Sequence, residues 1–368
     1  MSAEVALVMM IKNEQRNIEK SFKSVLGLCA SFVVLDTGST DQTIPIVKSF
    51  CDKHKVALHL KCSTFVNFEV SRNELLDYAD EVFATTPHFL LLLDCNDELN
   101  PTSIPEIREV IAKKTNVLGF DLCQEWKMPD SLDTYFNTRL VLSGSGWRFK
   151  GAVHEVLLND KVSVRVQCPS IVLFQDRTHD DDKTVKRFKR DKQLLYADHL
   201  KNPKDTRTLF YLAQTCSCLQ QFKEAYEYYL LRSTLSKDEE VFHCYLRLGD
   251  TTYNLGHPWE ESQAWYMKAF ILGNRAEPLV RLAEHYQTTK EWNAAYMFAV
   301  QACDLKAPEK CMLFVNKKSY EYTRWHILAN VALQLNKMKE GARAAREVVK
   351  SSYATEEDKK LVGFYVSV

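Results

Sequence analysis

The sequence predicts two domains of different class: an α/β domain with a mostly parallel sheet, followed by an all-α domain of repeated helix pairs. Three observations predict this. Short apolar runs alternate with amphipathic stretches through residues 1–180, these signals stop near residue 185, and a repeat with a period near 34 residues then takes their place. A length of 368 residues also favours two domains over one.

Five short apolar runs predict the strands of the first domain. They span residues 5–11, 32–37, 56–60, 89–94 and 118–123. Amphipathic stretches at 17–28 and 41–54 separate the first three runs and predict helices. Strands joined by helices of this length indicate crossover connections and parallel neighbours. Because the runs are continuously apolar, we expect helices to cover both faces of the sheet.

Four later segments share a pattern of small residues. These segments are 211–230, 246–269, 280–300 and 326–347. Their small residues are Ala213 with Ala225, Gly249 with Ser262, Ala283 with Ala295, and Ala329 with Gly341, always 12 or 13 positions apart. Small residues where two helices cross, repeated at this period, are typical of tetratricopeptide-like helix pairs. We therefore expect a first domain at 1–182, a connecting helix at 183–205 and a repeat domain at 206–368.

The bulk composition excludes several classes of protein. Lys plus Arg and Asp plus Glu balance at 48 each, so a general affinity for nucleic acid or an acidic membrane is not expected. No apolar run is long enough to span a membrane. The 11 cysteines are odd in number and scattered, which predicts reduced thiols and a cytoplasmic location.

Polar residues follow two of the predicted strands. The stretch "VVLDTGSTD" places Asp36, Gly38 and Ser39 after one strand, and "LLLLDCNDEL" places Asp94, Asn96 and Asp97 after another. Ligands of open α/β sheets bind at such strand ends. Gly38 allows a close backbone approach, and the Asp36 carboxylate accepts hydrogen bonds from a base or ribose.

The second acidic loop offers hard oxygen ligands of the kind that Mn²⁺ or Mg²⁺ prefers when phosphates complete the shell. A cation would also explain why an apolar strand runs into clustered negative charge. The alternative is structural, because strand-terminal Asp and Asn also form turns and helix caps.

Five motifs in order resemble family 2 glycosyltransferases of the GT-A fold, a Rossmann-like α/β architecture. They are "MIKNE" (10–14), "VVLDTGSTDQT" (33–43), "FVNFEVSRNELLDYA" (65–79), "LLLDCNDEL" (91–99) and "WRFKGAVHEVL" (147–157). The resemblance covers residues 4–180. The repeats that follow look like the tetratricopeptide tail that some members of this group carry.

The resemblance implies a nucleotide-diphospho-sugar donor, with UDP-glucose or UDP-GlcNAc expected first. By this analogy Asn13 and Glu14 border the nucleotide pocket, Asp36 contacts the base beside Gly38 and Ser39, and Arg72 and Asn73 lie near the ribose and diphosphate. A guanidinium suits phosphate oxygens and keeps its charge at any working pH. The alternative for Arg72 is a surface ion pair with Glu69 or Asp77.

Asp94 opens a segment that looks like the family's metal-binding acidic motif. The sequence departs from the common form at Asn96, whose amide oxygen can coordinate a cation but lacks the charge. Either Asp97 substitutes, or metal affinity is weaker, or Asp94 acts alone. His179 corresponds to a later histidine that completes the metal shell in this fold, and its other interpretation is an exposed loop residue.

"GAVHEV" (151–156) stands where the family has its catalytic residues. The resemblance makes Glu155 the expected general base, which removes the acceptor's proton during inverting transfer. His154 would bind the diphosphate, assist the metal or orient Glu155. The preceding glycines and Trp147 suit a mobile loop closing over donor or acceptor.

The leading hypothesis is therefore a metal-dependent enzyme that transfers a sugar to a glycan, a protein or a small molecule. The repeats would present the acceptor, bind a protein partner or form a homodimer. The rival is a non-catalytic adaptor whose first domain is degenerate, and Asn96 is its best support. A nuclease or phosphatase on Asp94 and Asp97 leaves "DTGSTD" unexplained, and a dehydrogenase lacks Gly-x-Gly-x-x-Gly after the first strand.

Overall fold

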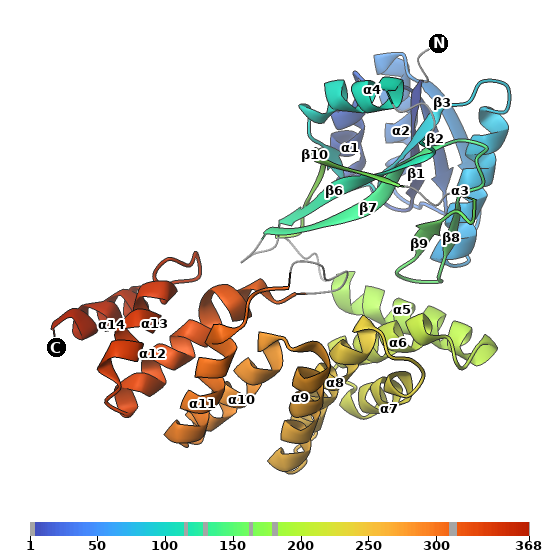
Figure 1. The fold of residues 1–368 in the computed structure, drawn as a ribbon. Coiled ribbons are helices and arrows are strands. Elements are labelled where there is room, and N and C mark those ends of the chain that lie inside the picture. Colours follow the sequence, from blue (N-terminus) through green and yellow to red (C-terminus); the bar gives the residue numbers. More distant parts are fainter. Residues whose placement is uncertain are drawn as a thin grey trace. The chain divides into compact units, whose positions relative to one another are not determined.

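A computed structural model describes residues 4–113, 117–127, 132–161, 165–178, 183–308 and 315–367. Contacts within the chain divide it into two compact units, Met1–Arg187 and Phe188–Val368. Each unit is described by itself, and Figure 1 labels most of their elements.

The N-terminal unit alternates strands and helices before two long strands and a short ribbon. Its elements are β1 (Val5–Ile11), α1 (Ile18–Val25), β2 (Cys29–Asp36), α2 (Thr43–His54), β3 (Ala57–Cys62), α3 (Phe68–Val82), β4 (Phe89–Leu92), β5 (Glu98–Leu99), α4 (Ser103–Lys113), β6 (Gly119–Lys127), β7 (Leu132–Leu142), β8 (Arg148–Lys150), β9 (Val156–Leu158) and β10 (Val166–Asp176). The five predicted strands and the two predicted helices are all present.

The main sheet has the order β3-β2-β1-β4-β7-β6-β10-β5. Neighbours within β3-β2-β1-β4 are parallel, as are β6 and β10, whereas β7 runs antiparallel to both β4 and β6. The predicted mostly parallel sheet is confirmed. Because β7 reverses direction between β4 and β6, the carboxyl ends of β1, β2, β4, β6 and β10 all lie at one edge of the sheet.

Helices and the short ribbon cover the two faces of this sheet. On one face, Leu7 and Met9 of β1 pack in a core that includes residues of α1, α2 and α4. On the other, Ala6 and Val8 pack with residues of α3 and with Phe149 of the β8–β9 ribbon. This alternation buries every residue of β1 but one, which explains its continuous apolar sequence.

Trp147 corrects the prediction of a mobile loop. Its side chain is 4% exposed and packs in the core on the α3 face. The indole Nε1 donates a hydrogen bond to the carbonyl oxygen of Leu118 at 3.0 Å. Trp147 therefore anchors the chain just before β8.

The C-terminal unit consists of helices that pack as successive antiparallel pairs. The helices are α5 (Lys183–Lys201, which crosses the boundary), α6 (Thr206–Cys218), α7 (Phe222–Ser233), α8 (Glu239–Asn254), α9 (Trp259–Gly273), α10 (Ala276–Thr288), α11 (Trp292–Asp304), the π-helix η1 (Ser319–Thr323), α12 (Arg324–Gln334), α13 (Met338–Val348) and α14 (Glu356–Ser367). Each predicted pair of small residues lies on successive helices and is buried. The predicted helix pairs are confirmed.

Gly249 shows why the repeat needs small residues. A Cβ at this position of α8 would lie 2.4 Å from the Tyr266 ring of α9. We expect Gly249→Ala to destabilise the helical unit, because overpacking typically costs about 1–3 kcal/mol. Alanine in place of a helix-interior glycine would by itself stabilise the helix by roughly 1 kcal/mol. We expect the cost of the clash with Tyr266 to outweigh this gain in stability. Urea unfolding followed by circular dichroism measures the change.

Gly363 provides the matched control. It lies in α14, where an added Cβ meets no atom within 4 Å. Gly363→Ala should therefore leave stability unchanged or raise it by at most about 1 kcal/mol. Equal effects of the two substitutions would contradict the packing explanation.

Two further observations concern the described residues as a whole. None of their helices combines the length and apolarity that crossing a bilayer requires. Their cysteines are all free thiols, and most of them are buried, including Cys29 and Cys95.

Candidate active site

Three loops meet at the carboxyl edge of β2, β1 and β4. They follow neighbouring parallel strands, so the sheet brings Asn13, Asp36 and Asp94 to the same edge. Thr37, after β2, donates its amide to the carbonyl oxygen of Ile11 at 2.9 Å. Cys95, after Asp94, donates its thiol to the carbonyl oxygen of Met10 at 3.6 Å. Backbone contacts with β1 thus fix both neighbouring loops.

Asp36 has one satisfied and one unsatisfied carboxylate oxygen. Its side chain is 2% exposed. Oδ2 accepts hydrogen bonds from the backbone N–H groups of Gly38 and Ser39, both at 3.0 Å. Oδ1 is buried without a hydrogen-bond partner among the described residues. A buried acceptor of this kind normally finds a donor, so this oxygen suits an N–H or O–H group of a ligand.

Asn13 and Glu14 fasten the loop after β1 to the loop after β2. Asn13 has a left-handed backbone (φ 57°), and its N–H donates to Ser39 Oγ at 3.0 Å. Its Oδ1 accepts from the Thr40 N–H at 2.7 Å, while the Glu14 N–H donates to Thr43 Oγ1 at 2.7 Å. The two segments that the sequence predicts to border a nucleotide therefore form one hydrogen-bonded unit.

The loop after β4 turns around Asp97. This side chain is 1% exposed, and its Oδ2 accepts the Asp94 backbone N–H at 2.9 Å. Its Oδ1 accepts from Gln124 Nε2 of β6 at 3.0 Å. Asp94 retains a 35% exposed side chain, and Asn96 is exposed. The buried Asp97 thus holds the turn that presents Asp94 and Asn96 to solvent.

Arg72 of α3 joins the acidic loop to the segment that contains Glu155. Its Nη2 donates to Asp94 Oδ1 at 2.5 Å, and its Nε lies 2.6 Å from Glu155 Oε1. Neither Glu69 nor Asp77 is its partner: Glu69 accepts the Gly151 N–H, and Asp77 pairs with Arg148. The alternative of a surface ion pair is therefore wrong, since Arg72 is only 11% exposed.

A second guanidinium approaches Asp94 from β7. Arg139 Nη2 donates to Asp94 Oδ2 at 3.2 Å, and its Nη1 donates to the carbonyl oxygen of Leu92 at 3.4 Å. Arg139 is also 11% exposed. Both oxygens of Asp94 thus face arginines. Arg139 is not among the site residues predicted from the sequence, although a lone arginine at the start of the apolar run "RLVL" was a usable signal.

The two arginines determine the protonation of the acidic loop. Burial opposes ionisation of Asp94, but the guanidinium groups of Arg72 and Arg139 outweigh it and hold the pKa of Asp94 well below its usual range. Burial raises the pKa of Asp97, and the nearby charge of Asp94 adds to that rise against the attraction of Arg139. Asp94 therefore carries the accessible negative charge.

Asn73 positions the segment before Glu155. Its Nδ2 donates to the Phe149 carbonyl oxygen at 2.9 Å, and its Oδ1 accepts the Phe149 N–H at 2.8 Å. Asn73 thus pairs with the backbone of β8, and the Phe149 ring lies 5.3 Å below the Arg72 guanidinium. His154 is exposed and has a left-handed backbone (φ 54°). Such strained positions often occur at functional sites.

The donor set that faces solvent consists of oxygens. It contains the Asp94 carboxylate and the Asn96 amide, and within the described ranges no three His, Cys, Asp or Glu side chains are grouped to hold a metal. Oxygens of this kind are the ligands that a hard divalent cation takes together with phosphate oxygens and water. Both oxygens of Asp94 accept hydrogen bonds from Arg72 and Arg139, so a cation would have to displace one guanidinium. His179 lies outside the described residues, so its role as a ligand stays a prediction.

Comparison with known proteins identifies the N-terminal unit. Residues 6–147 match the family "Glycosyl transferase family 2". The N-terminal unit contains a family 2 glycosyltransferase domain. The match includes the loops of Asn13, Asp36 and Asp94, and it ends before His154 and Glu155.

Two curated relatives share 25% identity with the chain. One is the glycosyltransferase SunS of Bacillus subtilis, over 226 residues that cover 59% of this chain and 50% of SunS. The other is a TPR repeat-containing protein of Synechococcus elongatus, over 168 residues that cover 46% of this chain and 39% of that protein. The aligned part of the chain thus spans half or less of the length of these relatives.

Some solved structures are similar to about half of the chain. MamA is 15% identical with a TM-score of 0.37, covering 49% of this chain and 95% of MamA. YrrB, described as a TPR protein with an unusual peptide-binding site, is 13% identical with a TM-score of 0.37, covering 47% and 82%. TM-scores of this size do not support an assignment of fold. The tetratricopeptide-like fold of the C-terminal unit follows from its helix pairs.

Proposed function

We propose that the chain transfers a sugar from a UDP-sugar donor to a hydroxyl group of a glycan, protein or small-molecule acceptor, with inversion at the anomeric carbon. UDP-glucose and UDP-GlcNAc are the first donors to test. The observation that carries the proposal is Arg72, which lies within the residues that match family 2 and contacts both Asp94 and Glu155. One side chain thereby connects the predicted diphosphate site with the predicted base.

The donor's base would lie against the loops after β1 and β2. The unpartnered Oδ1 of Asp36 would accept an N–H of the uracil ring, because a carboxylate offers only acceptors. Asn13, Glu14, Gly38 and Ser39 would shape this pocket through the hydrogen bonds that join their loops. Their rigidity would reduce the entropy lost on binding.

The diphosphate would lie beside Asp94. Arg72 and Arg139 keep their charge, and each fork can donate two parallel hydrogen bonds to phosphate oxygens. Mn²⁺ or Mg²⁺, held by Asp94 and Asn96 and by the predicted ligand His179, would supply positive charge to the leaving diphosphate. Asp97 would support these ligands through the turn that it stabilises.

Glu155 would act as the base. Its carboxylate would take the proton of the acceptor hydroxyl while that oxygen forms a bond to the anomeric carbon. The bond from this carbon to the diphosphate breaks, and UDP leaves with the bonding electrons. For this step the ion pair between Glu155 and Arg72 must break, so that the Glu155 carboxylate can contact the acceptor hydroxyl. The phosphates of the bound donor would favour this by attracting the Arg72 guanidinium. The exposed His154 would then bind the diphosphate or orient Glu155.

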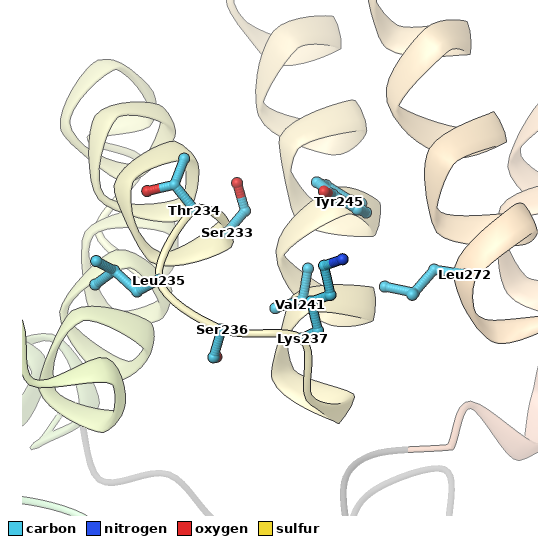
Figure 2. A pocket seen from close by; sticks show the side chains of 8 residues that line it. All are labelled: Ser233, Thr234, Leu235, Ser236, Lys237, Val241, Tyr245 and Leu272. Carbon is cyan, nitrogen blue, oxygen red and sulfur yellow. The ribbon is translucent and has the colours of Figure 1, made fainter.

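We propose that the helical unit recruits the acceptor, a protein partner or a second copy of the chain. It contains a cavity of about 460 Å³ between the α7–α8 loop, α8 and the end of α9. Figure 2 shows its lining, which combines apolar side chains such as Leu235 and Leu272 with Ser233, Thr234 and Lys237. An apolar wall with hydroxyl and ammonium groups suits an extended peptide.

Nucleotide binding tests the proposal before any acceptor is known. The full chain is incubated with UDP and Mn²⁺, and its melting temperature is measured with and without EDTA. Saturation at 100 times Kd should stabilise the first unit by about 2.7 kcal/mol, because only the folded state binds. Release of UDP from UDP-glucose and UDP-GlcNAc is measured in parallel. An unchanged melting temperature and no released UDP would favour the non-catalytic adaptor.

A further inference from the structure

A cluster of one arginine and two aromatic residues lies beyond the acidic loop. Trp126 is the last residue but one of β6, Tyr135 lies on β7, and Arg177 directly follows β10. The Arg177 guanidinium stacks 3.5 Å from the centre of the Trp126 ring. The Trp126 and Tyr135 rings meet edge to face at 4.7 Å. We call Trp126, Tyr135 and Arg177 the rim cluster.

The rim cluster holds its guanidinium in a defined orientation. Arg177 Nε donates to Gln175 Oε1, and the Gln175 side chain is 2% exposed. The Arg177 backbone N–H donates to the Lys127 carbonyl oxygen at 2.8 Å, which ties it to β6. These contacts use the face of the guanidinium, its Nε and the backbone N–H. They do not use Nη1 and Nη2, the two groups that together bind a carboxylate or a phosphate.

Arg177 differs from the other arginines of the site in its charge balance. Arg72 and Arg139 face Asp94, whose carboxylate raises the pKa of both against the effect of burial. Arg177 forms no ion pair with a carboxylate of the described residues, and burial lowers its pKa. The adjacent Asp176 is occupied by Lys127 at 3.5 Å and by Thr178. Asp97 and Asp94 also act on Arg177 electrostatically, but neither forms an ion pair with it. A half-buried cation with no ion-pair partner among the described residues is a costly feature that a ligand can offset.

The sheet order places the rim cluster beside the acidic loop and away from the loops after β1 and β2. Asp36 follows β2 and Asp94 follows β4, whereas β7, β6 and β10 lie on the other side of β4. The strand β5, which directly follows the acidic loop, pairs with β10 at Phe174 and Glu98, whereas β1 and β2 lie on the far side of β4. If the nucleoside occupies the β1–β2 side, the acceptor approaches from the β6–β10 side.

We propose that Arg177, held on Trp126, binds an oxyanion carried by the acceptor, either a carboxylate or a phosphate. The acceptor is then an acidic glycan, an acidic peptide or a phosphorylated molecule. This inference rests on the proposed sugar transfer, which places the donor at Asp36 and Asp94. Arg177 forms the anionic contact, and the edge of Tyr135 borders it.

The test uses the full chain and pairs of probes that differ only in charge. Transfer from the active UDP-sugar is measured with methyl glucuronide and glucose 6-phosphate, each against its uncharged counterpart. A charged hydrogen bond is worth about 1.5–3 kcal/mol, which corresponds to a preference of roughly 10- to 150-fold in kcat/KM. Arg177→Gln should reduce this preference toward one. The glucuronide and phosphate arms distinguish the two oxyanions.

A matched arginine and a binding measurement make the test decisive. Arg148→Gln removes an exposed arginine of the same unit, paired with Asp77, and should keep the preference. Saturation-transfer NMR measures binding of glucuronate, glucose 6-phosphate and glucose without turnover. If the wild type releases UDP but prefers no anion in either assay, the inference fails and the proposed function stands. If turnover is absent, the NMR comparison of wild type with Arg177→Gln still decides the anion site.

Discussion

Glu155→Gln is expected to lower kcat for sugar transfer by about 10²–10⁴-fold, the usual contribution of a general base. Glutamine keeps the size of the side chain and can still accept a hydrogen bond, but it cannot take the acceptor's proton. Its neutral amide also releases Arg72 from the 2.6 Å ion pair. UDP affinity should therefore stay the same or rise. Initial rates with the active donor and calorimetric titration with UDP and Mn²⁺ separate the two effects.

Glu109→Gln is the control for this substitution. Glu109 lies on α4 and pairs with Lys113, and its side chain is 58% exposed. The same chemical change at that position should alter neither kcat nor UDP affinity. A Glu155→Gln enzyme with near-normal kcat would remove Glu155 from the chemistry and leave His154 as the remaining candidate in that segment.

Arg72→Lys is expected to weaken UDP binding by about 10- to 100-fold, although the charge is retained. The guanidinium reaches Asp94 through Nη2 and Glu155 through Nε, and a single ammonium group cannot serve both positions in that geometry. Each lost charged hydrogen bond costs about 1.5–3 kcal/mol. Calorimetric titration with UDP and Mn²⁺ gives the affinity directly.

Arg72→Met should in addition destabilise the first unit. It leaves Glu155, whose side chain is 14% exposed, without its cationic partner. Breaking a buried pair costs about 3–5 kcal/mol, and we expect about 2–3 kcal/mol here because Asp94 keeps Arg139 and contact with water. Arg148→Lys and Arg148→Met, at an exposed pair, should change stability by less than about 0.5 kcal/mol. Equal results at both positions in urea unfolding would refute the bridging role.

The strand-end loops were predictable because they depend on local sequence. Each apolar run from 5–11 to 118–123 forms a strand, and parallel order follows from the helices between them. The position of Asp36 and Asp94 at one edge then follows from topology alone. The same holds for the small residues of the repeats, because helix crossings need them wherever they occur.

The partners of Arg72 were not predictable in the same way. They depend on how the chain returns after β4. β7 pairs antiparallel with β4 and brings Arg139 to Asp94, and the β8–β9 ribbon brings Glu155 to Arg72. The sequence of these segments does not show which strand or helix they will contact. β7, for example, mixes polar and apolar residues along its length. Trp147 was misassigned for a related reason: the glycines around it suggested a surface loop, whereas its ring fills space beside Gly119.

The shared use of two arginines has a consequence for how this chain can vary. Arg72 and Arg139 both contact Asp94, and Arg72 also contacts Glu155, so each of these positions depends on at least one other. Replacing one leaves a charge elsewhere without compensation, and the effects of two replacements will not add. We therefore expect Arg72, Asp94, Arg139 and Glu155 to change together in evolution. Related proteins that keep the activity should keep all four, and those that lose it should lose all four.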